Sequence, residues 1–423
     1  MGSMVMRVCI VGAGVIGLTT AYELAKRGYK VTVVDACDSY GRGTSFANGA
    51  QLSYSYVAPL ADPSIWRQLP AYLLSPTSPL TWKPKLDIRQ WTWLVRFLAA
   101  CNSAASHRTT AALLELANLS RFKLHKLQTR HALDFNHRTA GKLVLLSSVQ
   151  ALDGARRQIR MQADLGCEQE LLSPAQCIAV EPALTHAIER WVGGVYTPSE
   201  EVGDCALFCE QLGAALKKDY GVHFIFNTNV LEIRRSNNTI NALSTSSGDI
   251  AADQFVLANG VGSPRLADQL GIRLPVYPLK GYSITIENEA LTSQMPSVSI
   301  TDQEKKVVYA RIGNRLRVAG RAEIVGENLH VDEMRCRELA AEAHELFFPG
   351  QAVEDCIKPW AGLRPATPTG LPIIGKTPFA NLFLNCGHGA LGWTLACGSA
   401  ELLAADMAGQ PRPMQGIPLG LAA

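Results

Sequence analysis

Residues 12–17 have the spacing of a phosphate-binding turn, G-x-G-x-x-G, and Asp35 follows 23 positions after the first glycine. In this pattern the first glycine allows a tight turn, the second lets the backbone approach a pyrophosphate, and the third permits close helix–strand packing. An acidic residue at about this distance accepts hydrogen bonds from the hydroxyls of an adenosine ribose. We therefore predict a dinucleotide site made by Gly12, Gly14, Val15, Ile16, Gly17, Asp35 and Ala36.

The segments around this turn predict the βαβ unit that must hold it in place. Residues 7–11 are a β-branched run typical of a buried parallel strand, residues 18–27 have helical spacing, and residues 30–35 predict a second strand. The amino end of the helix supplies free N–H groups and partial positive charge for phosphates. This context disfavours the alternative of a purely structural glycine turn. The acidic residue disfavours NADP, whereas this unit alone is compatible with both FAD and NAD.

Two later segments favour FAD. Residues 254–260 predict a strand that runs into a turn of small residues, a common companion of an FAD site. Residues 385–394 read N-C-G-H-G-A-L-G-W-T and lead into a helix over 394–407, whose amino end can stabilise negative charge on a reduced flavin. In these segments we assign to cofactor binding Ala258, Asn259, Gly260, Gly387, His388, Gly389, Leu391, Gly392, Trp393 and Thr394.

The rest of the chain predicts a second, interleaved domain. Further helices are expected over 91–129, 151–165, 203–220 and 332–347, and further strands over 142–147, 222–234 and 382–385. Residues 276–325 alternate apolar and polar side chains, as antiparallel strands do. Residues 1–4 resemble a cloning remnant, and residues 59–84 predict an irregular excursion. A length of 423 residues suits two domains, to which we assign 1–58, 199–276 and 360–423 (FAD-binding) and 59–198 and 277–359 (substrate-binding).

Four segments together resemble the small subunit of bacterial D-amino acid dehydrogenase, in the D-amino acid oxidase/glycine oxidase superfamily. They are residues 44–53 (T-S-F-A-N-G-A-Q-L-S), 278–283 (P-L-K-G-Y-S), 360–365 (W-A-G-L-R-P) and 387–394. The resemblance covers almost the whole chain. It implies bound FAD and an α/β fold, in which a Rossmann-type FAD-binding domain is interleaved with an α+β substrate domain built on an antiparallel sheet.

The resemblance also implies a reaction. The expected activity is oxidative deamination of a D-amino acid to a 2-oxo acid and ammonia, with electrons passed to a quinone or another respiratory acceptor. Cys386 does not match the cysteine that carries flavin covalently in sarcosine oxidases, so we expect non-covalent FAD. Small side chains in residues 44–53 let the backbone donate to the flavin ring. Along the ring we place Ser45, Asn48, Ala50 and Gln51, and against the adenine Val230; Leu52 of the same loop is also assigned to cofactor binding.

Hydride transfer from the substrate Cα to flavin N5 requires that the substrate carboxylate be held in place. Arg364 is the leading candidate, because a guanidinium can meet a carboxylate with two parallel N–H bonds and the resemblance places the arginine of G-L-R-P there. The alternative is a structural ion pair. Tyr282 and Tyr54 are candidates for closing the pocket, with a packed core role equally open. His388 can bond the substrate or tune the flavin, and we assign it no general-base role.

Two features depart from the family pattern. Tyr54 or Tyr56 stands where a small residue is usual, and Arg321 replaces an uncharged residue. Arg321 is expected to be either a second carboxylate clamp or a solvated surface residue. These changes leave open a D-proline or cis-4-hydroxy-D-proline dehydrogenase and a glycine- or sarcosine-type flavin oxidase. A non-catalytic flavoprotein and an NAD-dependent dehydrogenase are the alternatives from other classes.

The composition of the chain limits which binding partners and which cellular location we expect for the protein. A net charge of +3 gives no argument for nucleic-acid binding. No run of about 18 apolar residues predicts a spanning helix, so we expect a cytoplasmic protein, with peripheral contact with the inner membrane left open. The 11 scattered cysteines are interpreted as reduced thiols, and no metal site is assigned. The carboxylate pairs Glu200/Glu201 and Asp302/Glu304 are interpreted as surface charge.

Overall fold

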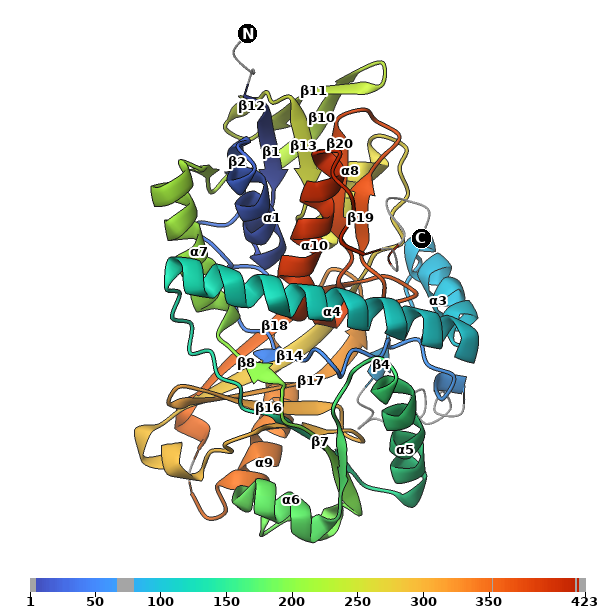
Figure 1. Ribbon diagram of the computed structural model, residues 1–423, viewed down its shortest axis with the longest axis vertical. Coiled ribbons are helices and arrows are strands. Elements are labelled where there is room, and N and C mark those ends of the chain that lie inside the picture. The colour runs from blue at the N-terminus through green and yellow to red at the C-terminus, as the bar shows by residue number, and fades with distance from the viewer. Residues whose placement is uncertain (1–4, 67–79, 352, 415–416, 418–423) are drawn as a thin grey trace.

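The computed structural model describes residues 5–66, 80–351, 353–414 and 417. The predicted cloning remnant at residues 1–4 and part of the predicted excursion, residues 67–79, lie outside the described residues. Figure 1 shows two sheet regions, one above the other, with the long helix α4 (Ser103–His131) running across the molecule between them.

The upper region contains the predicted glycine turn. Its sheet has the strand order β19-β20-β13-β1-β2-β9, parallel throughout except that β19 is antiparallel to β20. Val8 to Val11 of β1 are all buried, as expected of a parallel strand covered on both faces. The elements of this region are β1 (Arg7–Val11), α1 (Val15–Lys26), β2 (Lys30–Val34), α7 (Cys205–Tyr220), β9 (His223–Ile225), β13 (Gln254–Leu257), α8 (Ser263–Asp268), β19 (Ile373–Lys376), β20 (Leu382–Cys386) and α10 (Gly392–Met407).

Two small sheets accompany the upper region. One is an antiparallel sheet of three strands, β10 (Val230–Ser236), β11 (Thr239–Thr245) and β12 (Gly248–Ile250). The other pairs β3 (Gln51–Leu52), in the predicted flavin loop, with β8 (Glu201–Val202). Because β3 and β8 are far apart in sequence, this pairing anchors the loop against a distant segment.

The lower region is a large mixed sheet with the order β18-β14-β17-β16-β15-β5-β7-β6, and β4 pairs with β17. Ten consecutive residue pairs join β14 to β18, from Tyr277↔Ala366 to Ile286↔Ile357. Its elements are β4 (Leu80–Trp82), α3 (Ile88–Ala100), β5 (Lys142–Leu146), α5 (Val149–Ala163), β6 (Glu170–Leu172), α6 (Pro174–Val180), β7 (Gly193–Thr197), β14 (Tyr277–Glu287), β15 (Ser299–Asp302), β16 (Val307–Ile312), β17 (Arg315–Ile324), α9 (Glu333–Phe347) and β18 (Ile357–Ala366).

The predicted fold class is confirmed, and the differences have local causes. The helix expected over 91–129 is two helices, α3 and α4, separated at Cys101–Asn102, where the Asn102 side chain accepts a hydrogen bond from Ala105 N and caps α4. The region 222–234, for which one or two strands are expected, contains two, β9 and β10.

Two parts of the chain lie with a different domain from the one assigned from sequence. Helix α4, placed in the substrate domain, buries Leu113 and Leu116 in the same apolar core as Leu18 of α1 and Leu395 of α10. Strand β18 starts before residue 360 and belongs to the lower sheet. The upper core therefore takes in α4, and the lower sheet extends to Ala366.

Candidate functional site

The glycine turn has the geometry of a nucleotide cradle. Gly12 has φ +112°, and a Cβ there would lie 2.7 Å from Ala258 O, so a side chain would disturb the contact between β1 and β13. A Cβ on Gly17 would overlap the Gly12 carbonyl. Asp35 accepts hydrogen bonds from Ala13 N at 2.6 Å and from Cys37 N at 2.8 Å, which holds its carboxylate beside the turn. These residues fit a dinucleotide phosphate and ribose.

The predicted flavin loop is fixed at both ends to the upper region. Ser45 Oγ accepts a hydrogen bond from Val15 N at 3.0 Å, at the start of α1. Ser53 N donates to Thr394 Oγ1 at 3.1 Å, at the start of α10. Ala50 has φ 57°, a left-handed conformation that is uncommon for a residue other than glycine. The loop therefore lies between the amino ends of α1 and α10, where a dinucleotide is expected.

The same loop is also fixed to the lower sheet. Ser283 Oγ donates to Ala47 O at 2.6 Å, and Thr44 Oγ1 donates to Leu363 O at 2.8 Å. Arg317 Nη1 donates to Asn48 O at 2.8 Å. Its guanidinium is buried, and burial lowers its pKa to about 10. The loop thus joins the two regions, as a cofactor between them requires.

The remaining predicted cofactor residues lie along the same edge of the upper sheet. Ala258, Asn259 and Gly260 directly follow β13, and Val230, at the start of β10, is buried with Val34 of β2. Leu52 and Trp393 belong to the apolar core rather than to an open surface. Helix α10 starts at Gly392, and the side chain of its N-cap residue Leu391 makes no cap hydrogen bond. The N–H groups of a helix's first turn have no partner within the helix, so they can bond a ligand.

His388 lies between Gly387 (φ 79°) and Gly389 (φ 55°), two glycines that permit the sharp turn from β20 into α10. Its ring is buried, and burial lowers its pKa to about 3. Among the described residues its Nε2 has no hydrogen-bond partner. His388 is therefore a neutral imidazole with one ring nitrogen available to a ligand.

Strand register decides which side chains face the flavin loop. On β14, Ser283 bonds the loop, so Gly281 and Leu279, two and four residues away, lie on the same face. Arg364 of β18 is paired with Leu279 and lies over Gly281, because a Cβ at Gly281 would overlap the guanidinium. No carboxylate of the described residues lies within 4.0 Å of this guanidinium; its Nη1 donates to Arg321 O at 3.3 Å. The structural ion pair considered from sequence is therefore not observed.

Tyr282 lies on the opposite face of β14 from Arg364. Its hydroxyl donates to Glu323 Oε2 at 2.9 Å, and its ring is buried in the core formed with α9. The expectation that Tyr282 closes the substrate pocket is not met, because adjacent residues on a strand point to opposite faces.

Arg321 is a second correction. A bulge between β14 and β17 inserts one residue, and Arg321 there has φ 60°. Its side chain is buried and lies 3.1 Å from Glu338 of α9. Arg321 is therefore neither a second clamp nor a solvated residue, and only its carbonyl reaches Arg364.

Tyr54 points away from the loop. Its hydroxyl donates to Glu201 Oε2 at 3.2 Å, and the Arg121 guanidinium lies over its ring. The interpretation of Glu200 and Glu201 as surface charge is wrong: both are buried, and Glu200 accepts a hydrogen bond from Ser55 N at 2.6 Å. In the other pair Asp302 is buried and Glu304 is exposed.

Sequence reasoning missed Lys142, which the structure places against the flavin loop. Its Nζ donates to Gln51 Oε1 at 2.9 Å and to Ser53 Oγ at 2.8 Å, and lies 4.3 Å from the centre of the Tyr56 ring. Burial lowers its pKa to about 8. The only sequence signal is a lysine that opens the otherwise apolar strand K-L-V-L-L.

Comparison with known proteins agrees with this geometry. The chain matches the DAO family, described as FAD dependent oxidoreductase, over residues 7–406. It is 44% identical to D-amino acid dehydrogenase 2 of Ralstonia nicotianae, covering 99% of this chain and 100% of that protein. It is also 44% identical to D-amino acid dehydrogenase 2 of Pseudomonas aeruginosa, covering 96% of each.

Solved structures show the same fold at low identity. Glycine oxidase from Geobacillus kaustophilus superposes with a TM-score of 0.76 at 22% identity, covering 99% of both chains. L-proline dehydrogenase from P. horikoshii gives a TM-score of 0.74 at 18% identity, covering 96% of this chain and 94% of that chain. With a family match over nearly its whole length, the chain belongs to the DAO family of FAD-dependent oxidoreductases.

Proposed function

We propose that the protein oxidises a D-amino acid at Cα. The substrate loses a hydride from Cα and a proton from nitrogen to give an imine, which water converts to a 2-oxo acid and ammonia; a cyclic substrate stops at the cyclic imine. The observation that carries the proposal is Arg364, a guanidinium on the loop-facing side of β18 with no carboxylate beside it among the described residues. Full-length relatives named D-amino acid dehydrogenase support the substrate class.

Arg364 positions the substrate in this proposal. A guanidinium can hold a carboxylate with two parallel charge-assisted hydrogen bonds, which orients as well as binds. Its guanidinium occupies the space left open above Gly281, next to the strand that bonds Ala47 of the flavin loop. When bound, the flavin supplies the hydride acceptor. Holding the carboxylate on this face directs Cα toward the loop, and this positioning is the main contribution of the protein.

We also assign His388 and Lys142 to the site, His388 as a neutral side chain and Lys142 as a positively charged one. With a pKa of about 3, His388 is neutral and a weak base at working pH, so we assign it hydrogen bonding rather than proton abstraction. Lys142 is charged below about pH 8 and contacts Gln51, a residue that we place along the flavin ring. An ammonium there would stabilise negative charge on a flavin bound along this loop.

Steady-state turnover tests this proposal. The FAD-loaded protein is assayed with an artificial electron acceptor on D- and L-alanine, D-proline, cis-4-hydroxy-D-proline, glycine and sarcosine, with peroxide formation followed in parallel. We expect turnover of D-isomers, little peroxide in air, and release of the flavin by acid because it is bound non-covalently. Turnover confined to glycine, sarcosine or L-isomers would contradict the proposed substrate class, and rapid peroxide formation would show an oxidase.

We further propose that the protein works on the cytoplasmic face of the inner membrane, in contact with it through α3. Within the described residues no helix is long and apolar enough to span a bilayer. One face of α3, however, exposes Ile88 (78%), Trp91 and Val95 (66%), while Trp93 and Phe97 on the other side are buried. An apolar helix face at the surface, close to basic residues, is typical of a helix that lies in a membrane interface. The exposed basic residues near it are Lys83, Lys85, Arg89 and Arg96.

Helix α3 also lies close to the proposed substrate site. Trp93 Nε1 donates to Ala366 O, two residues after Arg364, and Trp93 and Phe97 pack with Leu279 on the Arg364 face of the sheet. Figure 1 shows α3 at the outer edge of the molecule. A membrane-dissolved quinone is therefore a suitable acceptor.

Vesicle flotation tests the membrane contact. We expect the protein to float with vesicles that contain phosphatidylglycerol, and I88E/V95E to stay at the bottom of the gradient. The matched control V149E/L231E changes two comparably exposed apolar residues elsewhere and should float as the unmodified protein does. Equal flotation of I88E/V95E and the control would contradict a contact through α3.

A further inference from the structure

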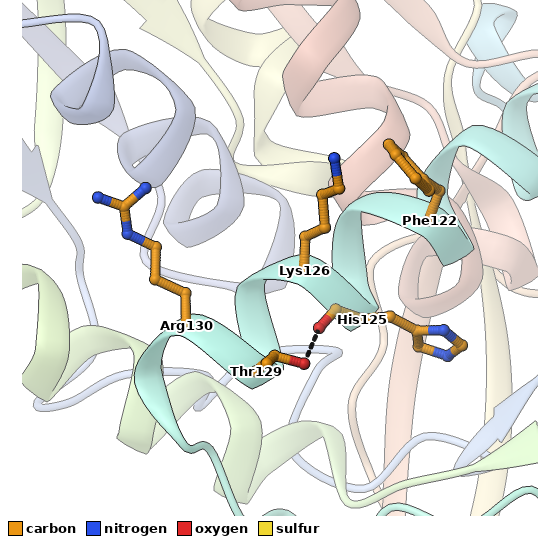
Figure 2. Close-up of a pocket in the computed structure, with 5 residues that line it drawn as sticks. All are labelled: Phe122, His125, Lys126, Thr129 and Arg130. Atoms are coloured by element: carbon orange, nitrogen blue, oxygen red, sulfur yellow. Dashed lines mark hydrogen bonds between the residues drawn. The ribbon is translucent and has the colours of Figure 1, made fainter.

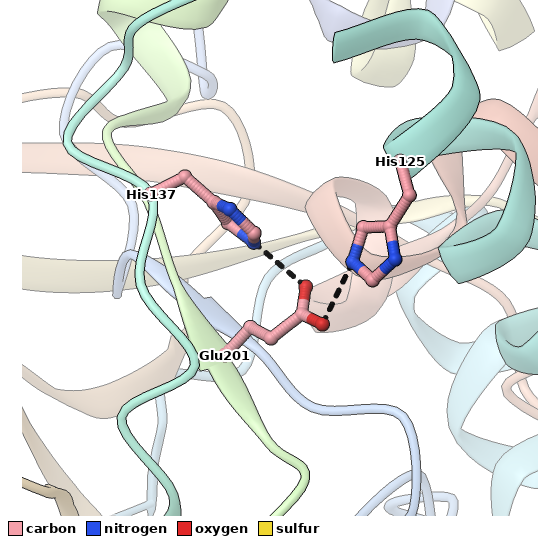
Figure 3. Close-up of side chains that lie close together, drawn as sticks. All are labelled: His125, His137 and Glu201. Atoms are coloured by element: carbon pink, nitrogen blue, oxygen red, sulfur yellow. Dashed lines mark hydrogen bonds and ion pairs between the residues drawn. The ribbon is translucent and has the colours of Figure 1, made fainter. Parts of the chain in front are cut away.

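Three side chains of metal-ligating type meet at a buried carboxylate outside the flavin loop. His125 comes from α4, His137 from the segment after α4, and Glu201 from β8. Figure 3 shows both rings pointing at Glu201: His125 Nε2 lies 2.8 Å from Oε1 and His137 Nε2 lies 2.8 Å from Oε2. The Glu201 carboxylate has no exposed surface. Three separate segments therefore converge on one point, which the proposed reaction does not use.

We propose that His125, His137 and Glu201 bind a divalent transition metal ion, with Zn²⁺ as the probe. Two imidazoles and one carboxylate are a ligand set that suits zinc, with a water as the fourth ligand. The candidate ligand atoms all lie within 4.8 Å of one another. Ligands about 2.0–2.2 Å from a shared zinc ion lie up to roughly 4 Å apart, so small rotations of the two rings close the set.

The two imidazole protons of this cluster can leave the Nε2 atoms, which are then free to bind a metal. In the metal-free arrangement each Nε2 donates to a Glu201 oxygen, which requires its proton on Nε2. A neutral imidazole can carry that proton on Nδ1 instead, which leaves the Nε2 lone pair for the metal. The exchange breaks two N–H···O bonds and forms two N–metal bonds and one O–metal bond.

A hydrated ion can reach the cluster from the surface. The His125 side chain is 42% exposed, and His125 also lines a shallow surface pocket along α4 with Phe122, Lys126, Thr129 and Arg130 (Figure 2). In contrast, His137 is largely covered and Glu201 fully buried. The cluster thus has an open side and a closed side, as an exchangeable metal site needs.

Two other groups compete for the carboxylate. Arg121 Nε donates to Glu201 Oε1 at 3.0 Å, and Tyr54 OH donates to Oε2 at 3.2 Å. The Arg121 side chain is partly exposed, so it can turn to solvent when a metal replaces it. Because its positive charge opposes that of the metal, removing Arg121 should strengthen metal binding. If the cluster serves only as an ion pair, neither the unmodified protein nor a variant without Arg121 should bind a metal there.

The bound ion would link segments that are far apart in the sequence. It would link α4 and β8, and β8 pairs with β3 in the flavin loop through Gln51↔Val202 and Leu52↔Glu201. A ligand that binds the folded state alone raises the unfolding temperature. Zn²⁺ is therefore expected to stabilise the FAD-loaded protein against heat.

Zinc titration of FAD-loaded, chelator-treated protein without a histidine tag tests the site. By calorimetry we expect one ion per chain, at least tenfold weaker binding in H125A and H137A, and tighter binding in R121Q. H107A, which removes an exposed histidine from the same helix, is the matched control and should bind as the unmodified protein does. Because the His125 side chain is partly exposed, we expect H125A to fold. H125A therefore tests the site even if H137A does not fold.

The unfolding temperature is measured in the same series. We expect Zn²⁺ to raise it in the unmodified protein and H107A but not in H125A. The proposal is overturned if H125A binds zinc with unchanged affinity and stoichiometry, or if the unmodified protein binds no zinc at all. Neither readout uses turnover, so the test is independent of the proposed reaction.

Discussion

Two cations, Arg364 and Lys142, face the flavin loop; Lys142 interacts with the buried Glu200 carboxylate, whereas Arg364 has no carboxylate of the described residues within 4.0 Å. Arg364 is on β18, at one end of the lower sheet order, and Lys142 is on β5, with four strands between them. An unpaired cation in a folded protein is expensive because desolvation favours its neutral form. The retention of Arg364 is explained if the carboxylate of a substrate completes the site.

The role of Arg364 predicts a strong effect of its removal. We expect R364M to raise KM for the D-amino acid by about 100-fold or more, since a hydrogen bond between charged groups contributes on the order of 2–3 kcal/mol. FAD affinity should not change, because Arg364 contacts the substrate. The matched control is Y282F, which acts on the opposite face of the sheet. It should leave KM within about threefold and reduce stability by about 1 kcal/mol through loss of the Glu323 hydrogen bond.

Lys142 predicts a pH dependence of stability. Its pKa is lowered from 10.5 to about 8 in the folded protein, so between these values the unfolded chain binds more protons. The free energy of unfolding should therefore rise with pH through this window, by up to about 3 kcal/mol relative to K142M. Denaturant unfolding of both proteins at pH 7 and pH 10.5 measures the difference. Parallel pH profiles for the two proteins would show that the lysine is not desolvated.

At the scale of elements, the Rossmann unit could be predicted from sequence and the pocket could not. The turn at residues 12–17 is a local pattern, and its strand, helix and acidic residue follow within one βαβ unit. The orientation of Tyr282 and Arg321 depends on register across β14, β17 and β18, and on one bulge. A bulge inserts a single residue without a composition signal, so the sequence does not show to which side the Arg321 side chain points.

The sequence also does not show which charged residues are buried. Glu200 and Glu201 look like a surface pair, but partners from α4 and from residues 53–55 bury them. Lys142 looks like the solvated end of a strand for the same reason. Which distant segments meet a charged residue is a property of the tertiary structure, so the cluster at Glu201 could not be found from the sequence.

The glycine turn gives a prediction at this scale. G12A should weaken FAD binding at least tenfold, because a methyl group there meets the Ala258 carbonyl and φ is +112°. Gly28 also has positive φ (+87°), but a Cβ there meets nothing within 4 Å. G28A therefore isolates backbone strain: we expect about 1 kcal/mol lower stability and unchanged FAD affinity. FAD titration of both apoproteins separates the two effects, and equal FAD affinity of the two variants would contradict the cradle.

At the scale of the whole molecule, the flavin loop joins the upper and lower sheets. Residues 44–53 bond α1 and α10 above, and β14, β17 and β18 below. Removing FAD should therefore lower the unfolding temperature of the molecule as a whole. Free FAD at 100 times its Kd should restore about 2.7 kcal/mol. Scanning calorimetry of apo and reconstituted protein checks this, and identical transitions would mean that the cofactor lies elsewhere.

Flavin bleaching without oxygen tests the central claim, D-amino acid oxidation at the Arg364 face, most directly. The FAD-loaded protein is mixed anaerobically with matched D- and L-isomers of alanine and proline in a stopped-flow instrument, and flavin absorbance is followed for the unmodified protein and R364M. We expect rapid bleaching by the D-isomers only, with a saturating concentration raised about 100-fold or more in R364M. Bleaching by L-isomers, or equal bleaching of the unmodified protein and R364M at low D-isomer concentration, would contradict the account.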